Sequence, residues 1–588
     1  MTEQPIVDYG LEYKWYSHPP VLPERDPDGF DRVDDAVVVV GAGPIGLTVA
    51  AGLSRMGIRT VVLEADETVC RSSKANGISQ RTFETLDRVA PELGDRLGAE
   101  AVPIAGSEMF FGRRPILEQV GTSKEQTGGK YHPMSYLSQW FIEDGLVQEL
   151  ARRPDTAELR WQSSVTAVEV HADHVVLDVS TPLGAYRMRA PWVVAADGGR
   201  SSVRSALGLR MTGTDYGVTL IIVDAVISGP QPLAKRRVWF DPDYLPGGML
   251  MHHLPPDGLW RIDIQLPLGT DVPDATTEDN VDRIIRSHLA DIGHDADEVR
   301  PIWTSTYRPR ALCLDDFRHG RILFAGDAAH LMPFFGGFGM NAGIDDADNL
   351  RWKLGLVIRG DAPDALLDTY TTERIPAILS SLEIQSRSAE FMTPTSRASE
   401  QLREAALTLA AEGDPLTAGL GRHRVTRPIP YASSPICPPD SEPFAGGPRP
   451  GAPVERGWLS IDGERRYLHD VLDGGLRILA FGAGADADAQ LDQLVDVAEG
   501  STLPVEVVRV VGPSETRTET PSRVTVAVDV DGALASRFDV HDGGVYLIRP
   551  DGIVSARWHR PSVDQLTDAL RVIVGDLVAS GHPEQVGA

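Results

Sequence analysis

A glycine-rich turn, GAGPIG at residues 41–46, is the strongest chemical signal in this sequence. It follows a β-branched run and precedes a helical pattern, and Glu64 ends the next expected strand about 20 residues further on. Gly41 allows a tight turn, Gly43 lets the backbone approach a pyrophosphate, and Gly46 lets helix and strand pack closely. Glu64 would hold a ribose through its hydroxyls, and the helix N-terminus adds partial positive charge. The pattern predicts a dinucleotide site of the kind that FAD and NAD(P) share; the alternative is a purely structural turn.

A carboxylate and a second glycine-rich segment further along the chain favour a flavin. Asp327 follows the strand pattern RILFAG and can accept hydrogen bonds from a polyol such as a ribityl chain, which nicotinamide nucleotides lack. Residues 332–341, MPFFGGFGMN, open a helix whose free N–H groups and dipole could face the N1/C2 edge of a flavin and stabilise charge there. Asp345, Asp346 and Asp348 near the start of this helix are expected to be surface charges that complement its dipole.

These residues need a buried parallel sheet to position them. AVVVV at 36–40 is typical of a strand in such a sheet, and 45–57 and 58–65 are expected to form a helix and the next strand, making a βαβ unit. Further buried strands are expected at PWVVAAD and RILFAG, followed by a long helix over 341–360. Because these segments are far apart in the chain, the domain that they share must be discontinuous.

A hairpin in the middle of the chain predicts a second, antiparallel domain. In residues 247–266 two strand-like runs flank the turn signal Pro255-Pro256-Asp257-Gly258. If Leu254 pairs with Leu259, the alternation of side chains sorts the hairpin into two faces. One face then holds His252, Arg261, Asp263 and Gln265, and the other holds Met251, His253, Trp260, Ile262 and Ile264. We expect His253 and Trp260 to be packing residues.

The sequence as a whole predicts a mixture of α/β and α+β units. We expect an N-terminal arm at 1–35, a discontinuous Rossmann-like FAD-binding domain at 36–210 and 312–395, an antiparallel-sheet substrate domain at 211–311 with part of 100–137, a Pro-rich linker at 427–456, and a C-terminal α/β domain at 457–588. Nine prolines in 428–453 are expected to make that linker a semi-rigid connector. The arm is expected to lie extended over the body.

The composition excludes several other classes of protein. Lys plus Arg number 56 against 84 Asp plus Glu, and the net charge of −28 repels a polyanion such as nucleic acid. The three cysteines, Cys70, Cys313 and Cys437, are too few and too scattered for a disulfide framework or a closed zinc site. We see no signal peptide and no membrane-spanning run, so we expect a cytoplasmic globular protein without a metal.

Four stretches of the sequence resemble the class A flavoprotein monooxygenases, the single-component aromatic hydroxylases of the p-hydroxybenzoate and phenol hydroxylase type. They are VVVVGAGPIGLTVAAGLSRMGIRTVVLEAD, VVAADGGRSSVR, RILFAGDAAHLMPFFGGFGMNAGIDDADNLRWKL and VYLIRPDGIVSARW, and they span most of residues 36–560. The resemblance implies FAD as cofactor, NADPH or NADH as a transient co-substrate, and a thioredoxin-like C-terminal domain. That domain has no Cys-X-X-Cys pair, so we expect it to serve in packing or in forming a homodimer.

The resemblance also assigns residues to the cofactor. Asp197 and Gly198 would lie near the pyrophosphate and the path of NAD(P)H, and Gln139 near the ribityl or phosphate region; a structural turn and a helix-surface glutamine are the alternatives. Lys74 stands where many relatives have an arginine, so it keeps the charge but loses the planar fork. The expected cofactor-binding set is Gly41, Gly43, Pro44, Gly46, Glu64, Lys74, Gln139, Asp197, Asp327, Pro333, Gly337, Gly339, Met340 and Asn341. Pro333, Phe334, Phe335 and Met340 are expected to line an apolar pocket.

The implied reaction oxidises an aromatic ring. NAD(P)H reduces FAD, the reduced flavin captures O2 as a C4a-hydroperoxide, and the distal oxygen passes to the ring. A base near the substrate hydroxyl would help, because an unperturbed phenol has a pKa of about 10. Asn76 stands where phenol hydroxylase has an aspartate, and Asp263 where it has a tyrosine. Asp263 is therefore the first catalytic candidate, with Arg261 and His252 on the same expected hairpin face and Tyr216 from the loop at 213–216.

We thus expect an NAD(P)H-dependent flavoprotein monooxygenase that hydroxylates a phenolic or polyketide-like aromatic substrate. Two alternatives stay open: Baeyer–Villiger oxygen insertion on the same fold, and a flavin-binding scaffold without turnover. A flavin halogenase is disfavoured because the sequence lacks the Trp-X-Trp-X-Ile-Pro element of that group.

Overall fold

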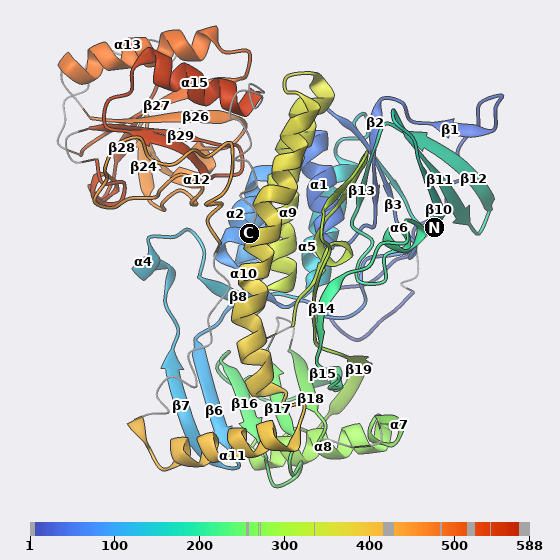
Figure 1. The fold of residues 1–588 in the computed structure, drawn as a ribbon. Helices are drawn as coiled ribbons and strands as arrows, with labels where there is room; N and C mark the ends of the chain where they lie inside the picture. The colour runs from blue at the N-terminus through green and yellow to red at the C-terminus, as the bar shows by residue number, and fades with distance from the viewer. Residues whose placement is uncertain are drawn as a thin grey trace, which may run out of the picture.

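A parallel sheet assembled from distant parts of the chain forms the centre of the molecule (Figure 1). The structure is a computed structural model that describes residues 6–254, 258–267, 270, 272–333, 335–415, 428–482, 485–513, 524–540 and 543–574. The expected turn residues 255–257, Phe334, residues 427, 483 and 484, and the end of the C-terminal domain from 575 lie outside the described residues.

The central sheet has six strands. Their order is β21 (Arg318–His319), β22 (Ile322–Phe324), β13 (Trp192–Ala195), β2 (Ala36–Val40), β3 (Arg59–Leu63) and β9 (Ala157–Arg160). Strands β22, β13, β2, β3 and β9 are parallel, so segments from three distant regions of the chain share one sheet, as the sequence predicts. All five residues of β2 are buried, because the helix at 44–55 packs on this sheet and the strand at 184–190 also contacts β2.

Helices from four parts of the chain pack beside this sheet. Helix α1 (Pro44–Arg55) begins with proline at its first position, where the missing N–H costs nothing, and it packs against α9 (Gly339–Arg359). Helices α5 (Gln139–Ala151) and α10 (Asp368–Met392) complete the layer (Figure 1). The buried glycines Gly52 and Gly355 permit this close approach: a Cβ on Gly52 would lie 2.3 Å from the side chain of Arg351.

A second sheet, which has seven strands, lies near the C-terminal end of α10, at the bottom of Figure 1. Its order is β19 (Val299–Tyr307), β15 (Leu220–Ile227), β18 (Leu259–Gln265), β17 (Met249–His253), β16 (Arg236–Phe240), β6 (Gly106–Phe111) and β7 (Arg114–Val120). Helix α8 (Glu278–Asp291) covers one face, where Ile284 and Ile285 join a core with Trp260 and Ile262. Residues 106–120 therefore belong to the same sheet as residues 220–307.

The C-terminal unit is a separate α/β domain. Its sheet has the order β25 (Glu464–Tyr467), β24 (Trp458–Ile461), β28 (Val524–Asp529), β27 (Val505–Val511), β26 (Leu476–Phe481), β29 (Gly544–Ile548) and β30 (Val554–Trp558). Strands β26, β27 and β28 are parallel, β29 is antiparallel to β26, and β30 is antiparallel to β29. Helices α13 (Ala485–Gly500) and α15 (Val563–Val574) lie together beside the sheet (Figure 1). The expected fold class, α/β combined with α+β, is confirmed.

The Pro-rich segment and the N-terminal arm both pack against the body. Tyr431, Ile436 and Cys437 of the Pro-rich segment are buried in a core shared with α9 and the C-terminal domain, so this segment is not a free spacer. In the arm, Trp15 is buried beside Trp140. The strand β1 (Phe30–Arg32) then joins β12 (Gly184–Ala190), β11 (Val175–Thr181) and β10 (Ser164–Val170) in a small sheet.

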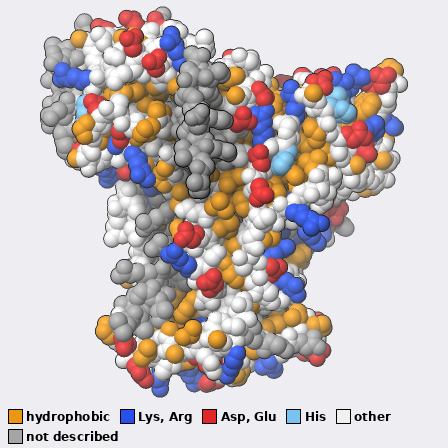
Figure 2. All heavy atoms as spheres, in the orientation of Figure 1, with side chains coloured by type: hydrophobic (Ala, Val, Ile, Leu, Met, Phe, Trp, Pro, Cys, Tyr) orange, Lys and Arg blue, Asp and Glu red, His pale blue; other side chains and the backbone are white. Residues whose placement is uncertain are grey.

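The remaining elements are short or peripheral. They are β4 (Gly77–Ser79), α2 (Gln80–Val89), α3 (Leu93–Glu100), β5 (Val102–Pro103), α4 (Lys124–Thr127), β8 (Met134–Tyr136), α6 (Ser202–Ala206), β14 (Thr212–Asp215), α7 (Val272–Ala275), β20 (Arg310–Cys313), η1 (Gly326–Ala328), β23 (His330–Leu331), η2 (Asp364–Leu367), α11 (Arg397–Ala411), α12 (Leu468–Val471) and α14 (Leu534–Arg537). Among the described helices, none combines the length and apolarity needed to cross a membrane. On the face drawn in Figure 2, acidic and basic side chains are interspersed.

Candidate active site

A cavity of about 850 Å³ lies between the central sheet and the seven-stranded sheet. Its wall begins at Gly41 and Gly43, continues past Asp197 and Asp327, and ends at Asp263 on β18. Ligand cavities in proteins usually measure about 300–1,000 Å³, so this one is large enough for a big ligand. The carboxyl ends of β2, β13 and β22 all meet at the end of the cavity that carries Gly41 and Gly43. Open parallel sheets bind ligands at this edge.

The glycine turn has the geometry that a pyrophosphate needs. Gly41 has φ of +104°, and a Cβ on Gly46 would lie 2.0 Å from the carbonyl oxygen of Gly41, so helix and strand touch there. A Cβ on Gly43 would meet nothing within 4 Å, so the turn is open toward the cavity at this residue. The N-cap residue of α1, Gly43, supplies no side-chain cap, which leaves the N-terminal N–H groups of the helix available to an anion.

Carboxylates stand on both sides of this turn. Glu64 accepts hydrogen bonds from the N–H of Ala42 at 2.6 Å and of Asp66 at 2.9 Å, and burial raises its pKa. Asp197 accepts from Val203 N–H through Oδ2, whereas its buried Oδ1 has no hydrogen-bond partner among the described residues. Asp327 on η1 lines the cavity, and desolvation by the surrounding cavity wall raises its pKa. An orphaned acceptor, an open glycine turn and a free helix N-terminus are what a dinucleotide with a polyol chain requires, so these residues fit FAD.

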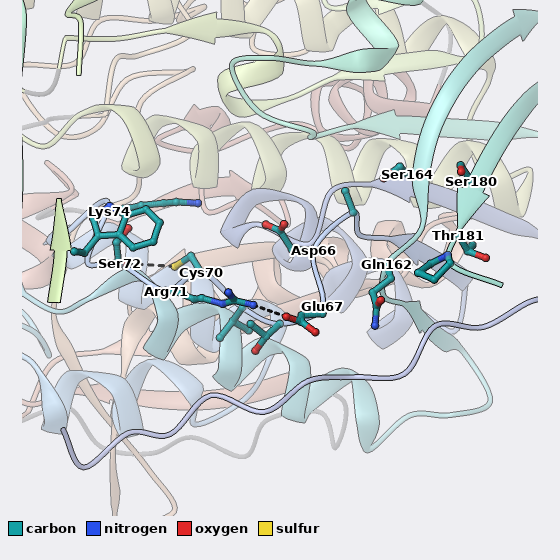
Figure 3. A pocket seen from close by; sticks show the side chains of 15 residues that line it. Asp66, Glu67, Cys70, Arg71, Ser72, Lys74, Gln162, Ser164, Ser180 and Thr181 are labelled. Atoms are coloured by element: carbon teal, nitrogen blue, oxygen red, sulfur yellow. Dashed lines mark hydrogen bonds and ion pairs between the residues drawn. The ribbon is translucent and has the colours of Figure 1, made fainter. Parts of the chain in front are cut away.

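A polar bay of about 810 Å³ adjoins the cavity at its outer end (Figure 3). Ser164 and Ser180 face each other from paired positions of β10 and β11, and the guanidinium of Arg71 pairs with Glu67 at 2.7 Å. Asp66 and Lys74 line both the bay and the cavity, so the two spaces are continuous. Lys74 has a left-handed backbone with φ of +37°, and its side chain is exposed there.

A connected set of polar side chains lies on the substrate-sheet wall. His253 Nε2 lies 3.2 Å from Asp263 Oδ2, and His253 Nδ1 lies 3.2 Å from the hydroxyl of Tyr136. Arg261 Nε donates to Asp263 Oδ1 at 2.7 Å, while its Nη1 donates to Ser73 Oγ and to the carbonyl of Lys74. The hairpin is therefore tied to the segment that carries Lys74.

The protonation states of this set follow from burial and neighbouring charge. Burial lowers the pKa of His253, so the imidazole is neutral near pH 7 although Asp263 favours its charged form. Burial alone would raise the pKa of Asp263, but the Arg261 charge and His253 hold it below its usual value. Burial raises the pKa of Tyr136 to about 12. The wall thus presents a carboxylate, a neutral imidazole and a neutral phenol in contact.

The expected hairpin register is wrong by one residue. His253 is opposite Arg261, and Met251 is opposite Asp263, so His253 shares the cavity face with Arg261 and Asp263. His252 lies on the other face, where its Nδ1 is 3.2 Å from His288 Nε2 beneath helix α8. Because side chains alternate along a strand, a slip of one residue exchanges the two faces. His252 is therefore a packing residue, and His253, which we expected to pack, lines the cavity.

Three other expected site residues are not among the described residues that line the cavity. Residues 212–215 form strand β14 rather than a loop, and Tyr216, which follows this strand, is buried. Asn341 accepts from Ser79 N–H and donates to the carbonyls of Gly77 and Gly337, so it ties β4 to α9. Pro333 is buried behind the wall.

The remaining expected cofactor residues do line the cavity, with one exception. Pro44, Lys74, Gln139, Gly198, Gly337, Gly339, Met340 and Phe335 belong to the wall with the residues above. Gly46 lies behind it, in the helix–strand contact. Gln139 accepts from Ala75 N–H at 3.3 Å and donates to Glu143 at 2.7 Å, so it is a buried residue rather than a helix-surface one.

The aspartates at the start of α9 are not surface charges. Asp346 and Asp348 are fully buried, and Asp345 pairs with Arg81 at 2.7 Å. Arg374 pairs with Asp346 at 2.6 Å, and Arg88 with Asp348 at 2.5 Å. The expectation failed because these arginines come from α2 and α10, which the local sequence does not place beside α9.

Two wall residues, Tyr136 and Arg236, escaped the sequence analysis. Arg236 begins β16 and lines the cavity with Val238, while Lys235 and Arg237 both pair with Glu108. Within the described part of the chain, no ion pair forms to Arg236, and its charge opposes the rise in the pKa of Tyr136 that burial causes. Because side chains two residues apart on a strand point to the same face, the spacing of Arg236 and Val238 could have indicated that they share one face of β16.

A cofactor cradle facing a largely antiparallel sheet, in which β16 and β6 pair in parallel rather than antiparallel as expected, defines the class of FAD-dependent aromatic monooxygenases. The chain belongs to the FAD binding domain family, whose profile matches residues 34–383, and residues 459–572 match the HcaD C-terminal domain. The resemblance to the class A flavoprotein monooxygenases is confirmed.

Individual relatives agree with this membership. The chain is 28% identical, over 91% of its length and 92% of the relative's, to the 3-(3-hydroxy-phenyl)propionate/3-hydroxycinnamic acid hydroxylase of Mycolicibacterium smegmatis. It is 29% identical to the 6-methylpretetramide 4-monooxygenase of Streptomyces rimosus, over 91% of this chain and 93% of that one. The solved structure of the anhydrotetracycline hydroxylase OxyS from Streptomyces rimosus superimposes with a TM-score of 0.65 at 28% identity, covering 92% of this chain and 99% of that one.

Proposed function

We propose that this FAD-dependent monooxygenase hydroxylates a phenolic or polyketide-like aromatic ring at the expense of NAD(P)H. In the overall reaction NAD(P)H, a proton, O2 and the arene give NAD(P)⁺, water and the hydroxylated arene. The relatives that act on a hydroxyphenylpropionate and on a pretetramide support both substrate types. The observation that carries the proposal is the Tyr136–His253–Asp263–Arg261 set on the wall opposite the cofactor cradle.

The cradle residues would hold FAD along the length of the cavity. The N-terminal N–H groups of α1, with Gly41 and Gly43, would bind the pyrophosphate, and Glu64 the adenosine ribose, near the polar bay. Asp327 would accept from the ribityl hydroxyls, and the start of α9 at Gly339 would face the flavin ring. When bound and reduced, FAD supplies the electrons that activate O2.

The apolar part of the wall would exclude water from the reacting ring. Ile222, Val238, Met251, Met332, Phe335 and Met392 line the cavity near the polar set. Exclusion of water prevents the activated oxygen from being lost as hydrogen peroxide. Methionines suit this task because they adapt to ring systems of different shape.

His253 would receive the proton of the substrate hydroxyl, and Asp263 would hold its imidazole. Both oxygens of Asp263 are occupied, one by Arg261 and one by His253, and its pKa is low, so the carboxylate is a poor base itself. A neutral imidazole next to a carboxylate can take a proton through Tyr136 and be stabilised as the cation. Arg236 would favour the phenolate that results.

A panel of substrates tests this proposal. Hydroxyphenylpropionates, simple phenols and polycyclic phenols are each scored with NADH and with NADPH for accelerated oxidation of the nicotinamide, oxygenated product and leaked hydrogen peroxide. Coupled formation of a ring hydroxyl with one class is the expected result. An ester or lactone product would instead establish Baeyer–Villiger insertion, and background oxidation with every compound would leave a flavin-binding scaffold.

We also propose that the C-terminal domain forms a homodimer. Light scattering of the full-length protein should then give twice the mass of 63.7 kDa, and a monomer would refute it.

A further inference from the structure

A turn of the C-terminal domain inserts into the helices behind the cofactor cradle. This turn, which we call the RPDG turn, comprises residues 549–552 between β29 and β30. Arg81 of α2 donates to the carbonyl of Asp551 at 3.2 Å, and Arg351 of α9 donates to the carbonyl of Pro550 at 3.1 Å. Two arginines of the cofactor-binding domain thus donate hydrogen bonds to the backbone of the turn.

The side chain of Arg549 joins the turn to α10. Arg549 is fully buried and forms two hydrogen bonds to Glu373, at 2.6 and 2.9 Å. Lys353 of α9 contacts the same carboxylate at 2.7 Å. Burial would raise the pKa of Glu373, but Arg549 and Lys353 hold it well below its usual value. Loss of one member would leave the others buried and uncompensated, which is strongly destabilising.

The contacts continue from α10 to the cavity wall. Arg374, next to Glu373, donates to Asp346 at 2.6 Å and to the hydroxyl of Tyr431 at 3.0 Å; the Tyr431 ring lies 5.5 Å from the Arg549 guanidinium. Asp346 accepts from Gly326 N–H at 3.0 Å. Gly326 precedes Asp327, so an unbroken series of contacts runs from the C-terminal domain to a residue of the cradle.

A second series reaches the start of α9. Arg81, which donates a hydrogen bond to the RPDG turn, also pairs with Asp345 at 2.7 Å. Asp345 lies in the second turn of α9, whose first residue, Gly339, lines the cavity. Both cavity-facing parts of this region, η1 and the N-terminus of α9, are therefore anchored to the same turn.

We propose that the C-terminal domain positions the cofactor cradle through the RPDG turn, with Arg549 as the main positioning residue. The domain then contributes to the affinity for FAD although none of its described residues lines the cavity. Asp346 holds η1 through Gly326, and Arg374, which pairs with Asp346, contacts Tyr431 and follows Glu373 on α10. This role is independent of the substrate and of the reaction proposed above.

The affinity of the full-length protein for FAD tests this inference. The matched variants are Arg549→Met and Arg557→Met, because Arg557 is also buried and also bidentate, but with Asp440, away from α9 and α10. We expect Arg549→Met to raise the Kd for FAD at least about fivefold, the lower end of coupling between distant sites. Arg557→Met should change it less than about twofold, and Arg549→Lys should recover part of the loss.

Thermal unfolding and a second variant separate positioning from general damage. Tyr431→Phe removes only the hydroxyl that Arg374 contacts, and it should also weaken FAD binding, so it decides the question if Arg549→Met does not fold. An unchanged Kd in folded Arg549→Met, or equal losses in Arg549→Met and Arg557→Met, would overturn the inference. None of these measurements needs turnover, so failure of the proposed reaction would leave them unaffected.

Discussion

His253 and Asp263 lie side by side on neighbouring strands of the substrate sheet, with 3.2 Å between Nε2 and Oδ2. The carboxylate is buried and also held by Arg261, so it stays ionised and orients the imidazole. The other imidazole nitrogen faces Tyr136. In the proposed reaction, this relationship would let His253 act as the base through which a substrate hydroxyl loses its proton.

The first prediction compares two adjacent histidines. His253→Gln should lower kcat about 10²- to 10⁴-fold, the usual contribution of a general base. His252→Gln, on the opposite face against His288, should leave kcat within about twofold, since it contacts nothing in the cavity. Steady-state kinetics with a coupled substrate measures both. The reverse order of effects would show that the polar set has been assigned to the wrong face.

The second prediction concerns the arginines of β16. Arg236→Met should raise KM about tenfold or more for a substrate that binds as a phenolate or carries a carboxylate, since hydrogen bonds to charged groups are worth roughly 1.5–3 kcal/mol. Arg237→Met removes an arginine that pairs with Glu108 on the other face, so KM should not change. If a neutral, non-ionising substrate loses as much affinity as an acidic one in Arg236→Met, the effect is not electrostatic.

The third prediction separates two glycines of the cofactor turn. Gly46→Ala places a Cβ 2.0 Å from the Gly41 carbonyl oxygen and should reduce the free energy of unfolding by about 1–3 kcal/mol. Gly43→Ala meets no protein atom, so thermal unfolding without FAD should be unchanged while FAD binds about tenfold more weakly. Calorimetry and flavin fluorescence distinguish the two. Equal FAD affinity in wild type and Gly43→Ala would argue against a pyrophosphate at this turn.

The fourth prediction is a pH dependence of stability. Burial would raise the pKa of Glu84, but His469 and Arg456 lower it to about 2. In the unfolded chain the carboxyl has an ordinary value near 4.5, so the unfolded state takes up the proton first as the pH falls. This carboxylate should therefore contribute up to about 3 kcal/mol above pH 4.5, and the contribution should disappear between about pH 4.5 and 2.

Denaturant unfolding at several pH values measures this contribution. Glu84→Gln should be less stable than wild type near pH 6 and should lose less stability on acidification, because its side chain does not titrate. Glu412→Gln, at an exposed position, serves as the control and should follow the wild-type curve. Parallel curves for wild type and Glu84→Gln would mean that Glu84 keeps an ordinary pKa.

The sequence alone determined the cofactor end of the site, for a local reason. The glycine turn, the preceding strand and α1 are contiguous, so the spacing of Gly41, Gly43 and Gly46 already dictates which glycine faces the cavity and which packs. The shared parallel sheet could also be predicted, because β2, β13 and β22 are each buried, β-branched or apolar runs in their own right.

The substrate end and the role of the C-terminal domain were decided by tertiary structure. One residue of register exchanged His252 and His253, and register depends on how the hairpin closes rather than on the alternation within each strand. Asp346 and Asp348 are buried because Arg374 and Arg88 pair with them from other helices. Arg549 likewise pairs with Glu373, which lies far away in the chain. Such ion pairs form only when the folded backbone brings distant side chains within a few ångströms of each other.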